Sequence, residues 1–451
     1  MVQTPEPTAA EPMYLEVTTP SAALDSAKKI AIPSFSPTWA LYASATVIGR
    51  KKVMMASALI MIVGAIIQAS SNSVAMFVVG RLVAGVASGI ATGLVGGYIN
   101  EVAPPHLRNS LGIGLQISLS FGILMVVCTF FFANTSSGWR YIAGFPIVWG
   151  ALILAAAPFL LVESPAWLLS NGRRDEAAHV MKQIYGEDHV NLAFSWFEPH
   201  ASASDLETPR AGSGIEHAEL PVESTLAQLV SPLFRRQLIV AIGVAAAQQL
   251  SGVNAVFYYS SSFFQDAGIS DDRIGNVIVN AMNLVPTFFV GPLASRYGNK
   301  KVLLVGLMGM LLSAIGMTIA LLTGVSALSI VFTALYVGFF ALSLGPLIYV
   351  VTADLFPDSV RASACSICIF FNYLSNLVVG VSFPYIADGL DDLSFLPFIV
   401  ILALYVLFTL KMVPETVGKT SDEIQNEFRL LREKNAPPTP VTSDHSQAFS
   451  S

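Results

Sequence analysis

Ten runs of apolar residues follow one another along the chain, with polar loops between them. A helix that crosses a bilayer needs roughly 20 apolar residues, and the runs approach or exceed that length. They lie at 53–70, 75–100, 110–133, 141–162, 237–263, 274–294, 302–323, 327–353, 362–387 and 394–412. The pattern predicts an all-α polytopic membrane protein.

A shorter and more polar stretch, 33–49, precedes the first run. Residues 1–32 are rich in Pro, Thr and Glu and contain no apolar run. We therefore expect a disordered N-terminal tail and no signal peptide. We interpret 33–49 as the remnant of a helix whose beginning is missing, and a truncated gene model is one explanation of it.

Two polar phrases recur half a chain apart. EVAPPHLRNS at 101–110 returns as DLFPDSVRAS at 354–363, so that the acid and the arginine of each phrase are both separated by 253 residues. GRKK at 49–52 matches GNKK at 298–301 with an offset of 249, and Glu163 matches Glu415 with an offset of 252. These constant offsets indicate a tandem duplication.

Composition and charge support a membrane-embedded duplication. The chain is 54% hydrophobic and 12% charged, against about 25% charged residues in an average soluble protein. It has no dense basic patch with interleaved aromatics, so we expect the lipid bilayer and no nucleic acid as a partner. If the GRKK loop is cytoplasmic, most other basic loops are cytoplasmic too. Both repeats then have the same orientation, as the two halves of major facilitator transporters do.

The expected organisation has two transmembrane halves, of which the first shows four helices and a fragment where the architecture requires six. Residues 173–186 have helical composition and end in a glycine. The expected segments are a tail at 1–32, an incomplete first half at 33–162, a cytoplasmic helical linker at 163–235, a second half at 236–413 and a cytoplasmic tail at 414–451.

The segment QQLSGVNAVFYYS at 248–260 resembles the signature of the sugar porters, the branch of the major facilitator superfamily that includes the glucose facilitators. Five further motifs follow the family's order: GRLVAGVASG (80–89), YINEVAPPHLR (98–108), ESPAWLLSNGR (163–173), GPLIYVVTADLFPDSVR (345–361) and PETVGKTSDEI (414–424). The resemblance covers about 49–424. It implies the major facilitator fold and alternating-access transport of a hexose-like monosaccharide by facilitated diffusion.

Carboxamide side chains suit such a substrate, because an amide both donates and accepts hydrogen bonds, as a sugar hydroxyl does. The Ser–Gly pair at 251–252 is a place where the helix can unwind and let neighbouring amides converge. The alternative is that the amides only hold helices together, and we assign Asn276 and Asn376 to that role. The resemblance places sugar contacts at Gln116, Gln248, Gln249, Asn254, Asn280 and Asn372, with aromatic contacts at Phe257, Tyr258 and Tyr349.

The resemblance also implies a cytoplasmic gate, whose charges pair across the two halves when the outside is open. The implied gate residues are Arg50, Glu101, Arg108, Glu163, Asp354, Arg361 and Glu415. The chain departs from the family pattern at Thr46, Ser295, Asn299 and Ala166, where charged residues are usual. We therefore expect a thinner gate network.

Arg81 is the one charge well inside a predicted span. In proton-coupled relatives such an arginine faces an aspartate on the first helix, and no Asp or Glu lies within the ten runs. Facilitated diffusion is therefore favoured, and we expect the chain as written to insert but to transport poorly. Two alternatives stay open: a transport-inactive relative that acts as a sensor or interaction protein, and a truncated proton-coupled symporter.

No catalytic residues, cofactor or metal site is expected. All six histidines lie outside the apolar runs, and the CSIC segment at 365–368 lies on an apolar helix, where cysteines are small packing residues. We expect no enzymatic activity. Of the membranes available, the plasma membrane is favoured over the vacuolar membrane.

Overall fold

The computed structural model describes residues 48–104, 107–133, 137–197, 228–232, 234–257, 272–419 and 421–434. Within these ranges the chain is helical and contains no strand. The weak stretch before the first apolar run falls outside them except for its last two residues. The expectation that the first half is incomplete therefore lies outside the described residues.

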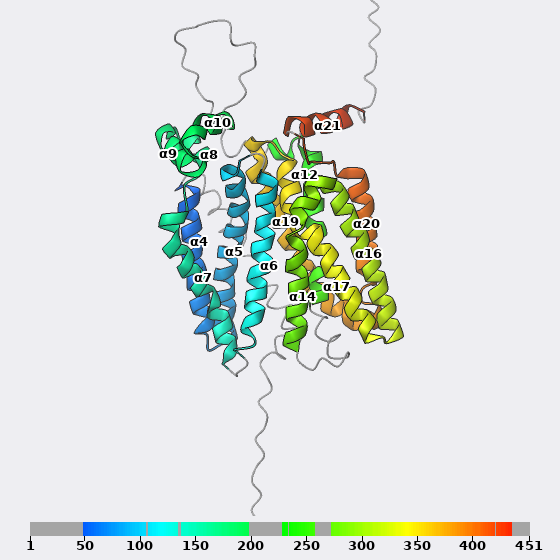
Figure 1. Ribbon diagram of the computed structural model, residues 1–451. Coiled ribbons are helices and arrows are strands. Elements are labelled where there is room, and N and C mark those ends of the chain that lie inside the picture. The colour runs from blue at the N-terminus through cyan, green and yellow to red at the C-terminus, as the bar shows by residue number, and fades with distance from the viewer. Residues whose placement is uncertain are drawn as a thin grey trace, which may run out of the picture.

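Four long helices make up the described part of the first half, and they coincide with the first four apolar runs. Helix α4 packs against both α5 and α7, and α6 lies beside α14 of the second half (Figure 1). Their bounds are α4 (Arg50–Ala69), α5 (Val74–Val102), α6 (Arg108–Thr129) and α7 (Gly138–Leu160).

Short helices gather at one end of the bundle (Figure 1). Helix α9 confirms the helix expected over 173–186, and Gly186 ends it with a φ of 88°. The Tyr185 hydroxyl donates to the carbonyl of Val102 at 2.6 Å and so fixes α9 to the end of α5. These elements are α8 (Pro165–Ser170), α9 (Arg174–Tyr185), η1 (Glu187–His189) and α10 (Val190–Ser195).

The second half accounts for the remaining six apolar runs, but not each run is one straight helix. Its elements are α12 (Arg235–Leu250), α14 (Asp272–Thr287), α15 (Val290–Tyr297), α16 (Asn299–Thr323), α17 (Ser326–Leu342), α18 (Leu344–Asp354), α19 (Asp358–Leu390), η2 (Asp391–Leu393) and α20 (Leu396–Met412). Helix α21 (Ser421–Lys434) follows and lies at the same end as α8–α10 (Figure 1).

Three of these runs are interrupted. Helix α12 ends at Leu250, and Gly252 has a φ of 84° before a further helical turn begins at Val253. Helices α14 and α15 meet at a bend of 41°. Ser343, with φ −138° and ψ −91°, separates α17 from α18. The break at Ser251 and Gly252 confirms the unwinding expected there.

The described part of the chain has eight helices long and apolar enough to cross a membrane, or nine if the bent pair α14 and α15 is counted as one span. Helix α20 is a shorter apolar helix. Buried apolar residues concentrate in the second half, around side chains such as Leu303, Tyr336 and Phe356. The architecture is that of a multi-pass membrane protein, and its two halves meet where α5 and α6 face α14, α18 and α19.

A cavity and an amide network between the two halves

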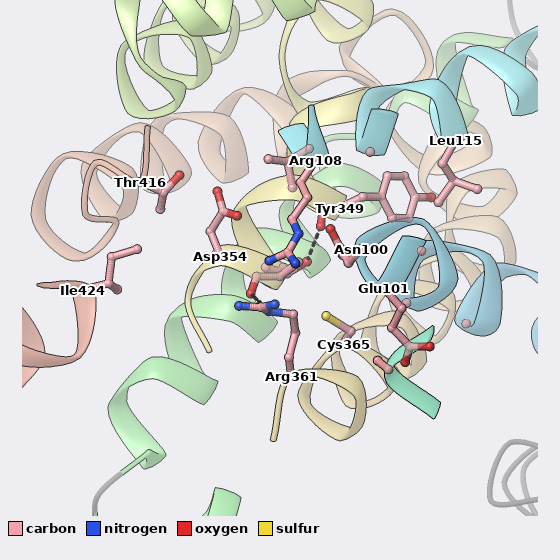
Figure 2. Close-up of a pocket in the computed structure, with 18 of the residues that line it drawn as sticks. Asn100, Glu101, Arg108, Leu115, Tyr349, Asp354, Arg361, Cys365, Thr416 and Ile424 are labelled. Atoms are coloured by element: carbon pink, nitrogen blue, oxygen red, sulfur yellow. Dashed lines mark hydrogen bonds between the residues drawn. The ribbon is translucent and has the colours of Figure 1, made fainter. Parts of the chain in front are cut away.

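A cavity of about 1000 Å³ lies between the halves at the end that carries α8–α10 and α21. Both halves line it: Thr92, Glu101 and Arg108 come from α5 and α6, and Tyr349 and Arg361 from α18 and α19. Figure 2 shows Arg108 and Arg361, one from each half, extending toward one another across it. This end carries the basic loops, which are expected to be cytoplasmic, so we expect the cavity to open on that side.

A network of amides lies around the break that follows α12. Gln248 Nε2 donates to the carbonyls of Gly345 at 2.7 Å and Leu344 at 3.3 Å, which lie at the break between α17 and α18. Gln248 Oε1 accepts from Asn372 Nδ2 at 2.9 Å and from Gln249 Nε2 at 3.2 Å. Gln248 and Asn372 are 3% and 5% exposed, so this part of the network is withdrawn from water.

The break lets amides on both sides of it meet. Gln249 Nε2 donates to Asn372 Oδ1 at 3.1 Å, and Asn254 Nδ2, five residues further on, donates to Gln249 Oε1 at 2.9 Å. Asn254 Nδ2 also donates to Asn376 Oδ1 at 2.8 Å. Asn376, expected to be only structural, therefore belongs to the same network. Its position one turn beyond Asn372 on the same helix was the signal that could have found it.

Aromatic side chains mark the inner end of the cavity. Tyr349 lines it and, with Asn372, also lines a small pocket beyond it. Tyr373 lines that pocket, and its hydroxyl lies 3.2 Å from Thr92 Oγ1, which joins α19 to α5 across the halves. Phe257 packs against the core of the second half, and Tyr258 lies outside the described residues. Thr92 was not among the residues that the sequence analysis expected to line the site.

Two of the residues expected to contact the sugar form their described hydrogen bonds outside the amide network. Gln116 Nε2 donates to Ser120 Oγ, one turn away on α6, at 3.3 Å. Asn280 Nδ2 donates to the carbonyl of Asn276 on its own helix at 2.8 Å. Neither side chain is joined to Gln248 or Asn372 by a hydrogen bond described here, although both are buried between the halves.

The described hydrogen bonds of the duplicated glutamates cap helices within their own halves, and their role in the gate stays a prediction. Glu163 Oε1 accepts from the backbone N–H groups of Arg50 at 2.7 Å and Lys51 at 3.2 Å, at the start of α4. Glu415 accepts in the same way from Asn299 at 2.8 Å and Lys300 at 3.2 Å, at the start of α16. A carboxylate is favourable there because the first N–H groups of a helix lack partners within it.

A glycine precedes each of these capped helices. Gly49 and Gly298 have φ values of 105° and 91°, which favour glycine. A Cβ on either would lie within 2.5 Å of the capping carboxylate. The sequence repeat at 49–52 and 298–301 is therefore a repeated capping structure.

The acid–arginine phrases also form matching local structures. Arg108 Nε donates to the carbonyl of Ala103 at 3.3 Å, and Arg361 donates to that of Phe356 at 3.0 Å, five residues back in each case. Glu101 forms an ion pair with Arg50 at 2.8 Å, within the first half. The cross-half lock stays a prediction for the state in which the cytoplasmic side is closed.

Replacing Glu101 with glutamine is expected to raise the labelling rate of Cys365 from the cytoplasmic side, by up to about fivefold. Glu101 and Arg50 belong to the same half, so their bond persists whichever way the halves tilt. Only a contact of Glu101 with the other half, made while the cytoplasmic side is closed, would change the ratio of closed to open molecules when it is lost. An exposed ion pair of this kind contributes about 0–1 kcal/mol. Cys365 lines the cavity, so it reports the open state once Cys128 and Cys368 are replaced by alanine.

The control for this variant is Glu176→Gln. Glu176 forms an exposed ion pair with Arg173 in the linker, so its neutralisation should leave labelling unchanged. Labelling of the Glu101 variant at the parent rate would show that Glu101 has no role in the gate.

Arg81 is exposed on α5, and no hydrogen bond or ion pair joins it to another described residue. The coupling role of Arg81 therefore stays a prediction.

No group of three or more His, Cys, Asp or Glu side chains that could hold a metal ion occurs in the described ranges.

Comparison with known proteins gives one consistent result. Residues 38–428 match the family model described as sugar (and other) transporter. The chain is 32% identical over 389 residues to the glucose transporter GlcP of Staphylococcus epidermidis, covering 85% of this chain and 83% of that protein. It is 35% identical over 399 residues to the facilitated glucose transporter member 1 of Gallus gallus, covering 84% and 77%.

Solved structures show the same fold. The proton:xylose symporter XylE of the major facilitator superfamily, bound to 6-bromo-6-deoxy-D-glucose, superposes with a TM-score of 0.71 at 23% identity, covering 91% of each chain. The inward open conformation of the xylose transporter XylE from E. coli superposes with a TM-score of 0.69 at 23% identity, covering 92% of each chain.

Proposed function

The chain belongs to the family of sugar (and other) transporters, and on that premise we propose that it carries a neutral hexose across a membrane by alternating access. The observation that carries this proposal is the amide network of Gln248, Gln249, Asn254 and Asn372 beyond the inner end of the cytoplasmic cavity. Relatives named as glucose transporters support a hexose.

The chemistry of the network favours an uncharged, hydroxyl-rich substrate. Its side chains are all amides, each with an acceptor and two donors, and no acid or base takes part in the hydrogen bonds described for it. A sugar hydroxyl can replace either partner of an amide–amide bond, because it both donates and accepts. The exchange costs little, since each bond broken is replaced by one of the same kind.

We further propose that transport is facilitated diffusion. A coupled proton needs a titratable group on the substrate path, and the described spans carry carboxylates only near their ends, such as Glu101 and Asp354. Residues 33–49 contain no Asp or Glu. We place the protein in the plasma membrane, where a facilitator for an external hexose would act, and imaging of the tagged chain tests this.

Replacing Gln249 with alanine is expected to weaken hexose binding by about 5- to 150-fold. The change removes the amide that joins Asn254 and Asn372 and leaves the sugar hydroxyls that it would bind unpaired, which costs about 1–3 kcal/mol. Binding of radiolabelled glucose to the purified chain in lipid nanodiscs measures the effect.

The matched control is Gln183→Ala, the same substitution at an exposed position on α9. Its affinity should equal that of the parent. Equal affinities of the Gln249 variant and the parent would remove Gln249 from the site, and a parent that binds no hexose would overturn the proposed function.

One observation favours a second candidate function, that of a sensor that binds sugar without transporting it. Asn299 stands where the family commonly has an arginine, and its side chain donates to Thr416 Oγ1 at 2.8 Å and so supplies no charge to the gate. Binding of hexose without exchange across proteoliposome membranes would favour this candidate.

A further inference from the structure

Two cysteines lie one turn apart on α19, in the wall between the cavity and the amide network. Cys365 lines the cavity, where Figure 2 shows it beside Arg361. Cys368 lines the small pocket beyond the cavity, which Asn372 and Tyr349 also line. The sequence analysis expected both cysteines to be packing residues. Cys368 does pack in the core of the second half, whereas Cys365 is half-buried and borders the cavity.

The two thiols lie on one face of the helix. Residues three apart in an α-helix are neighbours, with Cβ atoms about 5–6 Å apart, and helical side chains point back toward the N-terminus. The side chain of Cys368 therefore extends toward the turn that carries Cys365, and the two thiols are close enough to interact electrostatically. Neither forms a disulfide or a hydrogen bond with a described residue, so both sulfurs are available to a ligand.

This spacing suits a bridging ion better than a direct bond between the sulfurs. A disulfide requires Cβ atoms about 3.5–4.5 Å apart, so it would have to distort α19, which is continuous from Asp358 to Leu390. An ion bound between the two sulfurs spans the longer separation without distorting the helix. We expect the cavity to open to the cytoplasm, where thiols stay reduced.

The number and the type of the ligands select the ion. No third His, Cys, Asp or Glu in the described ranges joins the pair as a metal ligand, so an ion that requires four protein ligands, as structural Zn²⁺ does, is disfavoured. Thiolates are soft ligands that select Cu(I), an ion that is stable with two sulfurs arranged in a line. Binding converts both thiols into thiolates and releases their two protons to the water of the cavity.

The charges around the pair favour the bound form. One Cu(I) ion with two thiolates carries a single negative charge, and a nearby positive charge stabilises thiolates. Arg361 precedes Cys365 by one helical turn and lines the same cavity. Basic side chains outnumber acidic ones in the cavity wall, whose charged residues are Arg108, Arg361, Lys419, Glu101 and Asp354.

We propose that Cys365 and Cys368 form a two-coordinate binding site for Cu(I) in the wall of the cavity. The inference goes beyond the proposed function and does not depend on it. Cys365 gives the ion a path from the water of the cavity, and Cys368 supplies the second sulfur from the packed side of the helix. The site belongs to one helix of the second half, so it forms without any contribution from the first half.

The test is a competition for Cu(I) by the full chain in lipid nanodiscs, without oxygen. The ion is supplied as its coloured bicinchoninate complex, and the loss of colour measures transfer to the protein. The parent should withdraw one ion per chain, and X-ray absorption at the copper edge should show two sulfur ligands. Cys365→Ala and Cys368→Ala should each lose the bound ion, because a single thiolate does not hold it against the chelator.

Cys128→Ala is the matched control, since Cys128 lies on α6 and does not line the cavity. It should withdraw as much Cu(I) as the parent. A second measurement needs no variant: bound Cu(I) should protect Cys365 of the parent from alkylation by a maleimide, as mass spectrometry detects. A parent that takes no ion, single variants that take as much as the parent, an unchanged alkylation rate, or equal retention of Zn²⁺ would each overturn the inference.

Discussion

Alanine at Gly252 is expected to lower the free energy of unfolding by roughly 2–5 kcal/mol and to abolish hexose binding. Gly252 has a φ of 84°, and a residue with a Cβ is strained by about 1–2 kcal/mol in that region. A Cβ there would lie 2.4 Å from Phe398 Cδ1. Phe398 is buried and packs against Phe383 and Phe395, so its ring cannot move aside, and overpacking adds about 1–3 kcal/mol.

Binding is lost as well because this residue holds the break that brings Gln249 and Asn254 together. Thermal unfolding in detergent and glucose binding measure the two effects. Gly380→Ala is the control, since a Cβ there meets no atom within 4 Å and its backbone is helical. It should unfold at the parent temperature or slightly above. A Gly252 variant as stable as Gly380→Ala would contradict the prediction.

Alanine at Gln248 is expected to weaken hexose binding by about 150-fold or more. Its side chain donates to the carbonyls of Leu344 and Gly345 and accepts from Gln249 and Asn372. Its removal leaves the sugar hydroxyls that Gln248 would bind without a partner and releases the amide of Asn372 from its position, which together weaken binding by roughly 3 kcal/mol or more. Isothermal titration with glucose measures the loss.

Gln237→Ala provides the comparison for Gln248. Gln237 is equally buried on the same helix, but its Nε2 donates to Gln425 on α21 at 2.7 Å, at the end that carries the short helices. We expect its affinity for glucose to stay within about twofold of the parent. Parent-like affinity of the Gln248 variant would show that the network is structural and that the sugar binds elsewhere.

Hydropathy predicted the ten apolar helices because it depends on local composition. The constant repeat offsets predicted the relation between the halves. They did not predict the break at Ser343 or the bend after Thr287. The sequence holds a signal at each place, Pro346 just after the break and Pro286 just before the bend. A proline alone does not determine whether a helix breaks, because a break also requires neighbouring helices that hydrogen-bond the backbone groups it frees.

For the site, the residue types were predictable and the partners were not. The fit between amides and sugar hydroxyls singled out Gln248, Gln249, Asn254 and Asn372, which the fold brings together. The contact between Asn283 and Ser120 was missed because the two residues are 163 positions apart in the sequence and come together only through packing between the halves. Glu163 and Glu415 were expected at the gate, and their described contacts are backbone N–H groups, which a sequence pattern does not show.

These two capping glutamates have a consequence for how the protein is made. Glu163 and Arg50 are 113 residues apart, and Glu415 and Asn299 are 116 apart, and each bond lies wholly within one half. During synthesis, the first half can close this contact between its last and earlier helices before any of the second half has left the ribosome. The second half can then repeat the same closing step, so we expect the two halves to fold in succession within the bilayer.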